Sequence, residues 1–227
     1  MKRLAVIGGG AWGSALALVA ARAGAEVVLW ARDPNVVAAI NERHENPLFL
    51  PGIALDRSIA ATSDAAAAVA DADAALIVVP AQFLRGALTM LAPLVPADLP
   101  LLLCAKGIET GSLMTMSEVA RETAPKAPAA TLSGPSFAAE VARGLPTAVT
   151  IASCDPALAR AFVAALGSAR FRPYSSADPI GAEIGGAVKN VLAIELPITA
   201  AVDGVLHRGI AIDMMIEALL SRPYRSE

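Results

Sequence analysis

The fold of this chain is decided by the stretch RLAVIGGGAWG at residues 3–13. Residues 3–7 are mostly apolar, three glycines follow them, and a run rich in alanine and leucine then extends to residue 23. After Gly24, a second short apolar run covers residues 26–30. A strand, a glycine turn, a helix and a second strand in this order predict the first βαβ unit of a parallel sheet.

The glycines of this turn have the G-x-G-x-x-G spacing of dinucleotide-binding turns. Gly8 permits the tight turn, Gly10 lets the backbone approach a pyrophosphate, and Gly13 lets the helix pack closely on the strand. The helix N-terminus offers unpaired N–H groups and the positive end of its dipole to the anion. We therefore expect a bound dinucleotide at Gly8, Gly10, Ala11 and Gly13, the alternative being a glycine-rich turn without a ligand.

The end of the second strand bears on the choice of dinucleotide. An acidic residue there would hold the ribose 2′-hydroxyl of NAD, whereas this chain has Arg32, which suits a 2′-phosphate. Asp33 precedes Pro34 and is expected to cap the next helix. Arg32 therefore favours NADPH over NADH as the cofactor, the alternative being a solvated loop charge.

The composition narrows the class of protein. The chain has 227 residues, of which 56% are hydrophobic and 17% charged, and its net charge of −3 gives no general attraction to nucleic acid. Its longest apolar runs are too short or too interrupted to span a membrane. Cys104 and Cys154 lack metal-ligand spacing and are expected to be reduced core residues of a cytoplasmic protein. With two histidines, no metal site is expected.

Strands and helices alternate as far as residue 178, which predicts an α/β fold with a doubly wound, mostly parallel, Rossmann-like sheet over residues 1–178. Residues 179–227 form the second expected domain, a truncated all-helical region. Further strands are expected at residues 59–62, 73–80, 99–105, 129–133, 147–152 and 171–174. Further helices are expected at residues 34–43, 64–70, 82–94, 113–123 and 157–166, with a proline-punctuated loop at 46–52.

Two turns after buried strands are candidates for ligand binding, because ligands of open α/β sheets bind outside the carboxyl ends of the strands. Lys106 follows one strand, and a lysine there meets a phosphate or a ribose, or is simply solvated. The turn at Gly134 and Ser136 is suited to a small phosphorylated ligand, with Ser136 placed to cap the next helix. An ordinary capped turn is the alternative.

Lys189 and Asn190 lie in an apolar, glycine-containing helix expected at residues 181–194. Apolar surroundings disfavour the charged form of a lysine and lower its pKa toward a value useful for acid/base catalysis. Interchange of an alcohol and a ketone by hydride transfer requires such a group, and Asn190 would orient the lysine or the substrate. The alternative is a lysine that extends to water.

Taken together, these residues resemble the bacterial-type NAD(P)-dependent glycerol-3-phosphate dehydrogenases. The resemblance covers residues 1 to about 194 and is carried by the motifs at residues 8–13, 29–32, 50–52, 78–80, 106–109, 133–140 and 186–190. It implies reduction of dihydroxyacetone phosphate to sn-glycerol 3-phosphate, a glycerophospholipid precursor. It also implies that Lys189 is the catalytic proton donor, that Trp12, Arg32, Lys106 and Ala138 contact the dinucleotide, and that Lys106, Gly134, Ser136, Lys189 and Asn190 contact the substrate.

The chain departs from this family after Ile194. The family continues through a helical domain that supplies further substrate contacts, whereas here Ile194 leads directly into a segment resembling the family's end. An internal block is therefore expected to be missing at about Ile194/Glu195. A non-catalytic dinucleotide-binding remnant and another β-hydroxyacid dehydrogenase are the alternative functions, and a homodimer is possible.

Overall fold

The computed structural model describes the backbone of residues 1–195 and the side chains of residues 1–187. The chain divides into two compact units, Met1–Ile184 and Gly185–Glu227. Of the second unit, the described part is the C-terminal end of helix α8 (Pro179–Glu195). The expected domain boundary at residues 178/179 corresponds to the start of α8 and stays a prediction.

Eight strands of the described chain form one sheet in the order β10-β9-β8-β7-β6-β1-β2-β5. From β5 to β8 all neighbours are parallel, and these six strands, numbered along the chain, have the 3-2-1-4-5-6 order of dinucleotide-binding sheets. β9 is antiparallel to β8 and parallel to β10. The expected mostly parallel, Rossmann-like sheet is confirmed. The strands are β1 (Arg3–Ile7), β2 (Glu26–Trp30), β5 (Ala60–Thr62), β6 (Ala74–Ile77), β7 (Leu101–Leu103), β8 (Ala129–Ser133), β9 (Thr147–Ala152) and β10 (Phe171–Ser176).

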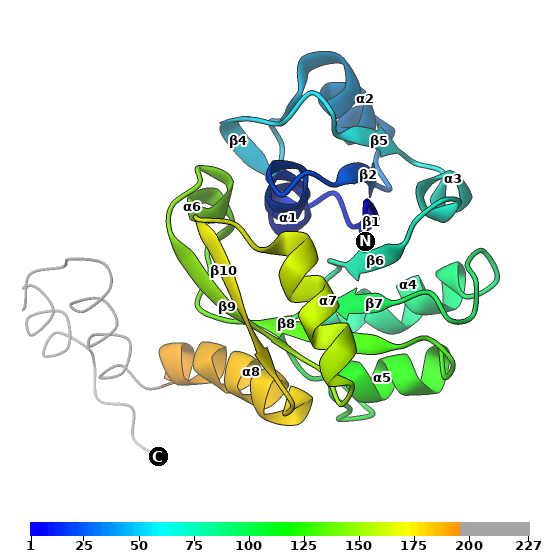
Figure 1. Ribbon diagram of the computed structural model, residues 1–227, viewed down its shortest axis with the longest axis vertical. Coiled ribbons are helices and arrows are strands. Elements are labelled where there is room, and N and C mark those ends of the chain that lie inside the picture. The colour runs from blue at the N-terminus through cyan, green and yellow to red at the C-terminus, as the bar shows by residue number, and fades with distance from the viewer. Residues whose placement is uncertain (196–227) are drawn as a thin grey trace, which may run out of the picture. The chain divides into compact units, whose positions relative to one another are not determined.

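Helices cover both faces of this sheet, and Figure 1 shows α1 and α7 on one side and α4 and α5 on the other. The first core cluster contains side chains of α1 (Ala11–Arg22), α2 (Pro34–Arg43), α6 (Ala138–Ala142) and α7 (Pro156–Leu166). The second contains side chains of α3 (Ala65–Val69), α4 (Leu84–Leu91) and α5 (Met116–Thr123). A short 3-10 helix, η1 (Ala81–Phe83), precedes α4.

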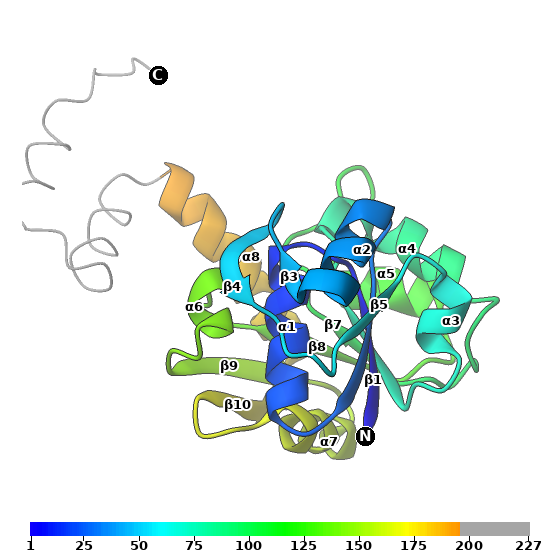
Figure 2. The same cartoon turned by 90° about the horizontal axis from the view of Figure 1, so that it is seen from above.

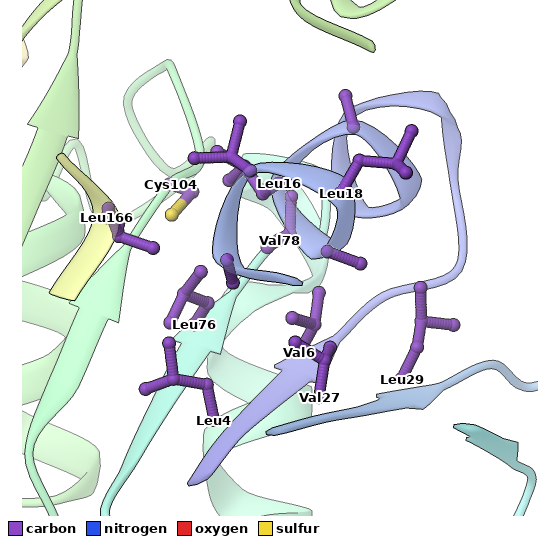
Figure 3. Close-up of a cluster of buried hydrophobic side chains, with 14 of the residues drawn as sticks. Leu4, Val6, Leu16, Leu18, Val27, Leu29, Leu76, Val78, Cys104 and Leu166 are labelled. Carbon is purple, nitrogen blue, oxygen red and sulfur yellow. The ribbon is translucent and has the colours of Figure 1, made fainter. Parts of the chain in front are cut away.

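The side-chain alternation of β1 explains why both faces are apolar. Leu4 and Val6 belong to the first cluster, whereas Ala5 and Ile7 belong to the second. Successive residues of a strand point to opposite faces, so a strand covered on both sides needs a continuous apolar run. Figure 3 shows Leu4 and Val6 meeting side chains of β2, β6 and α1.

Residues 46–52 differ from the expected loop. They belong to a small antiparallel hairpin formed by β3 (Glu45–Asn46) and β4 (Leu50–Ala54), with an irregular register between the two residues of β3. Prolines and a glycine obscured the pattern, because Pro51 and Gly52 are unfavourable in ordinary strands and are tolerated in this two-stranded edge element. β3 of this hairpin lies beside α2, and β4 lies beside α6 (Figure 2).

Helix starts were predicted partly correctly. Asp33, Asp64 and Asp155 each cap a helix by accepting a backbone N–H bond, as expected for Asp33 in particular. The expectation that Ser136 caps the next helix is wrong, because α6 begins one residue later, after Phe137, with no side-chain cap. The hydroxyl of Ser136 instead lies 3.4 Å from the Nζ of Lys106.

Helix α5 begins at Met116, three residues later than expected, because Thr115 and Glu118 form a reciprocal capping box. Leu113, placed in that helix from the sequence, has a left-handed backbone with φ of 59°. The intervening segment is therefore a loop that carries the chain from β7 to α5.

The two cysteines differ in burial. Cys104 is buried after β7, and burial raises the pKa of its thiol. Cys154 is exposed, so its assignment to the core is wrong, because β9 has already ended at Ala152. Both thiols are free. Within the described residues, no helix has the length and apolar character needed to cross a membrane.

Candidate dinucleotide and substrate site

The expected site residues follow the carboxyl ends of four strands in a row of five neighbouring parallel strands. Arg32 follows β2, the glycine turn follows β1, Lys106 follows β7, and Gly134 follows β8. β6, which ends before the segment 78–80, lies between β1 and β7. The chain reverses its direction of strand addition between β1 and β6, and this switch point is where open α/β sheets bind ligands.

The glycine turn has no room for side chains on its inner side. A Cβ at Gly13 would overlap the carbonyl oxygen of Gly8, and one at Gly8, where φ is +129°, would overlap the carbonyl oxygen of Val78. A Cβ at Gly10 would have no neighbour within 4 Å. The turn is therefore packed tightly against the strands and open on the side of Gly10, where a ligand can approach the backbone.

The start of α1 is free of competing anions. Gly10 is its N-cap, no side chain caps the helix, and its first turn contains no acidic residue. The first N–H groups of a helix lack intrahelical acceptors and lie at the positive end of its dipole. The open turn and the uncapped α1 together form a suitable binding site for a diphosphate.

A cleft with a volume of about 560 Å³ adjoins this turn. That volume is within the range typical of small-molecule sites. Arg32 lines the cleft and is exposed, whereas the carboxylate of Asp33 accepts bonds from the backbone and side chain of Asn35. The lining residues are Gly8, Gly9, Gly10, Trp30, Ala31, Arg32, Asp33, Val36, Phe49, Val78, Val79, Pro80, Gln82, Phe83, Gly86, Ala87 and Met90.

Lys106 joins three other expected site residues. Its Nζ lies 2.7 Å from the carbonyl oxygen of Gly134 and 3.4 Å from the Oγ of Ser136. The same ammonium lies 5.9 Å from the centroid of the Trp12 ring. This distance is within the range of cation–π attraction. The structure thus brings Lys106, Gly134, Ser136 and Trp12 into one group at the start of α1.

Trp12 and Ala138 both border the first core cluster. Both side chains are partly buried and pack against that cluster, Trp12 from α1 and Ala138 from the first residue of α6. Among the described residues, the indole Nε1 of Trp12 is buried without a hydrogen-bond partner. A buried indole N–H normally has an acceptor. An added ligand acceptor therefore fits this position.

Lys189 and Asn190 lie in helix α8, but their side chains are outside the described residues. Their expected roles therefore rest on the sequence alone. The expected gap after Ile194 also lies where residues 196–227 are outside the description.

The sequence profile of the family described as "NAD-dependent glycerol-3-phosphate dehydrogenase N-terminus" matches residues 3–159, most of the chain. The chain belongs to this family. It is 61% identical over 191 residues to a glycerol-3-phosphate dehydrogenase [NAD(P)+] of Rhodospirillum rubrum, a match that covers 84% of this chain and 55% of the relative. The corresponding enzyme of Paramagnetospirillum magneticum is 60% identical over 194 residues, covering 86% of this chain and 70% of the relative.

A crystal structure of glycerol-3-phosphate dehydrogenase from Coxiella burnetii is also similar. Its TM-score is 0.82 at 34% identity, and the match covers 95% of this chain and 65% of that one. The chain thus spans little more than half the length of the first relative and about two thirds of this solved structure. What this member of the glycerol-3-phosphate dehydrogenase family shares with these proteins is chiefly the nucleotide-binding half that the profile describes.

Sequence reasoning missed three residues around the site of this family member, Phe49, Phe83 and Asn46, and one buried carboxylate elsewhere, Glu183. Phe49 and Phe83 line the cleft and are substantially exposed. Phe49 directly precedes β4 and Phe83 ends η1, and only the position of these elements beside the glycine turn marks the two side chains. Asn46 and Glu183 are buried polar residues whose partners lie far away in the sequence, so no local pattern marks them.

Glu183, near the start of α8, is 6% exposed. Its carboxylate accepts a hydrogen bond of 3.0 Å from the backbone N–H of Ser117 and one of 2.8 Å from the hydroxyl of Ser117. Burial raises the pKa of Glu183, while the bonds from Ser117 act in the opposite direction. This carboxylate attaches the first turns of α8 to the N-terminus of α5.

Proposed function

We propose that this chain, as part of a glycerol-3-phosphate dehydrogenase, reduces dihydroxyacetone phosphate to sn-glycerol 3-phosphate with NADPH or NADH. The observation that carries the proposal is the group formed by Lys106, Gly134, Ser136 and Trp12 directly beside the uncapped start of α1. A site for a phosphorylated small molecule and a site for a diphosphate are thereby adjacent. The family and the enzymes to which the chain is similar support the same reaction.

The cofactor we propose is a nicotinamide dinucleotide, and NADPH in preference to NADH. The open approach to Gly10, the uncapped α1 and the unpaired Nε1 of Trp12 fit such a ligand. Arg32 lines the cleft while Asp33 is engaged at its own helix, which favours a 2′-phosphate over a free hydroxyl. When bound, the reduced nicotinamide supplies the hydride.

On the substrate side, Lys106 provides the positive charge and Ser136 a hydroxyl near it. The bond from Lys106 to the Gly134 carbonyl holds the ammonium at the carboxyl edge of β7 and β8. Ammonium and hydroxyl groups bind phosphate through short, charge-assisted hydrogen bonds. We propose that this pair binds the phosphate-bearing substrate next to the cofactor.

Lys189 is the proposed proton donor, supported by its place in the motif at residues 186–190. Reduction of the ketone adds a hydride to the carbonyl carbon and a proton to the carbonyl oxygen, giving the secondary alcohol. Lys189 would give the proton from Nζ, and Asn190 would orient the lysine or the substrate.

The test is a coupled assay with dihydroxyacetone phosphate on the chain and on Lys189→Ala. We expect Lys189→Ala to lose turnover while it still binds NADPH. Unchanged turnover would remove Lys189 from this role. NADPH binding without turnover by the unsubstituted chain would refute the reaction and leave a dinucleotide-binding protein.

We further propose a cytoplasmic location, a homodimer, and a domain boundary at residues 178/179. The free thiols of Cys104 and Cys154 support the reducing compartment, and the start of α8 at Pro179 supports the boundary. Cell fractionation, sedimentation of the purified chain and limited proteolysis test these points. A membrane-bound fraction, a monomer, or cleavage confined to other sites would contradict them.

A further inference from the structure

Asn46 is the residue that carries an inference beyond the expected site. It lies in β3 of the hairpin, 37 residues along the chain from Gly9, and its side chain is fully buried. Among the described residues, only Ser14 is a polar residue buried to the same degree. These two most deeply buried polar side chains are bonded to each other.

The amide of Asn46 connects two residues that line the cleft, Gly9 and Phe49, with the buried Ser14 of α1. Its Nδ2 donates to the carbonyl oxygen of Gly9 at 2.9 Å and lies 2.8 Å from the Oγ of Ser14. Its Oδ1 accepts from the backbone N–H of Phe49 at 3.3 Å. The partners fix the orientation of the amide, because a carbonyl oxygen only accepts and a backbone N–H only donates. Both N–H donors of the Asn46 amide and one lone pair of its oxygen are therefore engaged in hydrogen bonds.

The bond to Gly9 determines the direction of the next N–H group. The 9–10 peptide is trans, so the carbonyl of Gly9 and the N–H of Gly10 point in opposite directions. Because the carbonyl is held on Asn46, the N–H of Gly10 is directed away from Asn46. Gly10 is the N-cap of α1 and has no protein neighbour around its missing Cβ.

Asn46 also fixes the first turn of α1. The backbone N–H of Ser14 donates to the Gly10 carbonyl at 2.9 Å, while its hydroxyl bonds Asn46. A Cβ at Gly9 would lie 2.5 Å from the Ala31 Cβ, so the turn is also packed against the residue that follows β2. The turn can therefore not rotate its peptide without breaking the bonds of Asn46.

We infer that Asn46 is a positioning residue of the dinucleotide site. It presets the Gly10 amide toward the diphosphate and holds Phe49 in the cleft wall through a single buried amide. The inference rests on the proposed function for the identity of the ligand. A preset donor lowers the cost of ordering on binding, so its loss reduces affinity without removing any direct contact.

The test compares ligands with and without a diphosphate. Asn46→Asp keeps the size of the side chain and the acceptor for Phe49 but removes both N–H donors. At pH 8 we expect the Kd of ADP-ribose to rise about tenfold, as for loss of a hydrogen-bonded donor. The Kd of 2′-AMP, which has the adenosine and 2′-phosphate but no diphosphate, should change by less than about twofold.

Asn41 provides the matched control. Its amide donates to the carbonyl of Ala61 at 2.9 Å and accepts from the N–H of Ala61 at 2.8 Å, with no bond to the glycine turn. Asn41→Asp should leave both Kd values unchanged, even where it lowers the melting temperature similarly. Equal weakening of both ligands, or equal effects of the two variants, would overturn the inference.

If Asn46→Asp does not fold, a second variant and a measurement of amide proton exchange test the role of Asn46. Asn46→Ala removes the amide without adding a charge but also removes the acceptor for Phe49, and it should again weaken ADP-ribose more than 2′-AMP. In the unsubstituted chain, the Asn46 side-chain amide protons should exchange slowly with solvent and shift with ADP-ribose but not with 2′-AMP. Fast exchange or no shift would contradict the inference.

The readout separates this inference from the proposed reaction. Binding of ADP-ribose without reduction of dihydroxyacetone phosphate would refute the reaction and leave Asn46 in its role. Turnover with unaltered ADP-ribose binding in Asn46→Asp would refute only the role of Asn46. Failure of the unsubstituted chain to bind ADP-ribose would overturn both.

Discussion

The turn after β1 and the turns after β7 and β8 lie along one edge of the sheet but have different chemistry. The first consists of glycine backbone held by the neutral groups of Asn46 and Ser14. The second depends on one ammonium, that of Lys106, held by a carbonyl and a hydroxyl. Shape therefore governs the first region and charge the second. Substitutions that add volume should damage the first, and substitutions that remove charge should damage the second.

The largest effect should come from added volume in the glycine turn. Gly13→Ala places a methyl group on the Gly8 carbonyl oxygen, so α1 must move away from β1. We expect a loss of about 3 kcal/mol in unfolding free energy, as for overpacking of a tight core. Denaturant unfolding monitored by circular dichroism measures it.

Gly10→Ala is the matched control, because its Cβ would meet no protein atom within 4 Å. The fold should be nearly as stable as before, while NADPH affinity falls because the methyl group occupies the approach to the backbone. A Gly13→Ala chain as stable as Gly10→Ala would show that the turn is not closely packed.

The next effect should come from loss of charge in the second region. Lys106→Met removes the ammonium but keeps a long apolar side chain against Trp12. We expect kcat/KM for dihydroxyacetone phosphate to fall about 10- to 100-fold, the value of a charged hydrogen bond. Steady-state kinetics in parallel with thermal melting would check it. A fall in melting temperature that accounts for the lost activity would instead indicate a structural role.

Arg32 follows β2, next to the first region, and tests whether charge also contributes on that side of the cleft. Arg32→Ser removes an exposed guanidinium from the cleft and should raise the Kd for NADPH about tenfold with little change for NADH. Fluorescence titration with both cofactors gives the ratio. Equal weakening of NADPH and NADH would show that Arg32 does not recognise the 2′-phosphate.

The smallest effect concerns pH. Because burial raises the pKa of Glu183, the folded chain binds its proton more tightly than the unfolded chain does. This contribution to stability is fully present below the ordinary carboxyl pKa and is lost as the pH rises through the raised value. Glu183→Gln should therefore flatten the decline of stability over this range.

The measurement for Glu183 is the difference in unfolding free energy between the two chains as a function of pH. Four other carboxyl groups have lowered pKa values, and their contribution to the unfolding free energy is lost in the opposite direction, as the pH falls. They are Asp56, Asp73, Glu109 and Glu118. Their contribution is common to both chains and cancels in the difference. A difference that does not vary with pH would contradict the prediction. Because the Asn46 side chain does not titrate, Asn46→Ala should change the unfolding free energy by an amount that does not vary with pH.

The local part of this fold was accessible from the sequence. The alternation of strands and helices predicted the sheet, and Asp33 before Pro34 predicted the start of α2. Strands and helix caps could be recognised because they depend on residues that are neighbours in the sequence. The hairpin was missed because its pairing depends on tertiary contacts with Gly9 and Ser14 rather than on its own propensity. Ser136 was misassigned as a cap because its environment contains Lys106, which lies thirty residues away.

In the candidate site, too, features set by neighbouring residues could be predicted, whereas those set by distant contacts could not. The glycines could be recognised by spacing, because backbone geometry limits the residues that such a turn accepts. That Trp12, Lys106, Gly134 and Ser136 form one group required the strand order, since three separate segments contribute. Asn46 and Glu183 carry no local signal, and only their burial with distant partners identifies them.

The antiparallel pairing of β9 with β8 limits the length of the sheet edge along which the site residues lie. Five strands, from β2 to β8, direct their carboxyl ends to the same edge, whereas β9 and β10 point the other way. Four inter-strand spacings of about 4.8 Å make that edge roughly 19 Å long. Because β9 runs the other way, the row of strand carboxyl ends stops at β8, and the distance along this edge from Arg32 to Gly134 is set by the number of parallel strands between them.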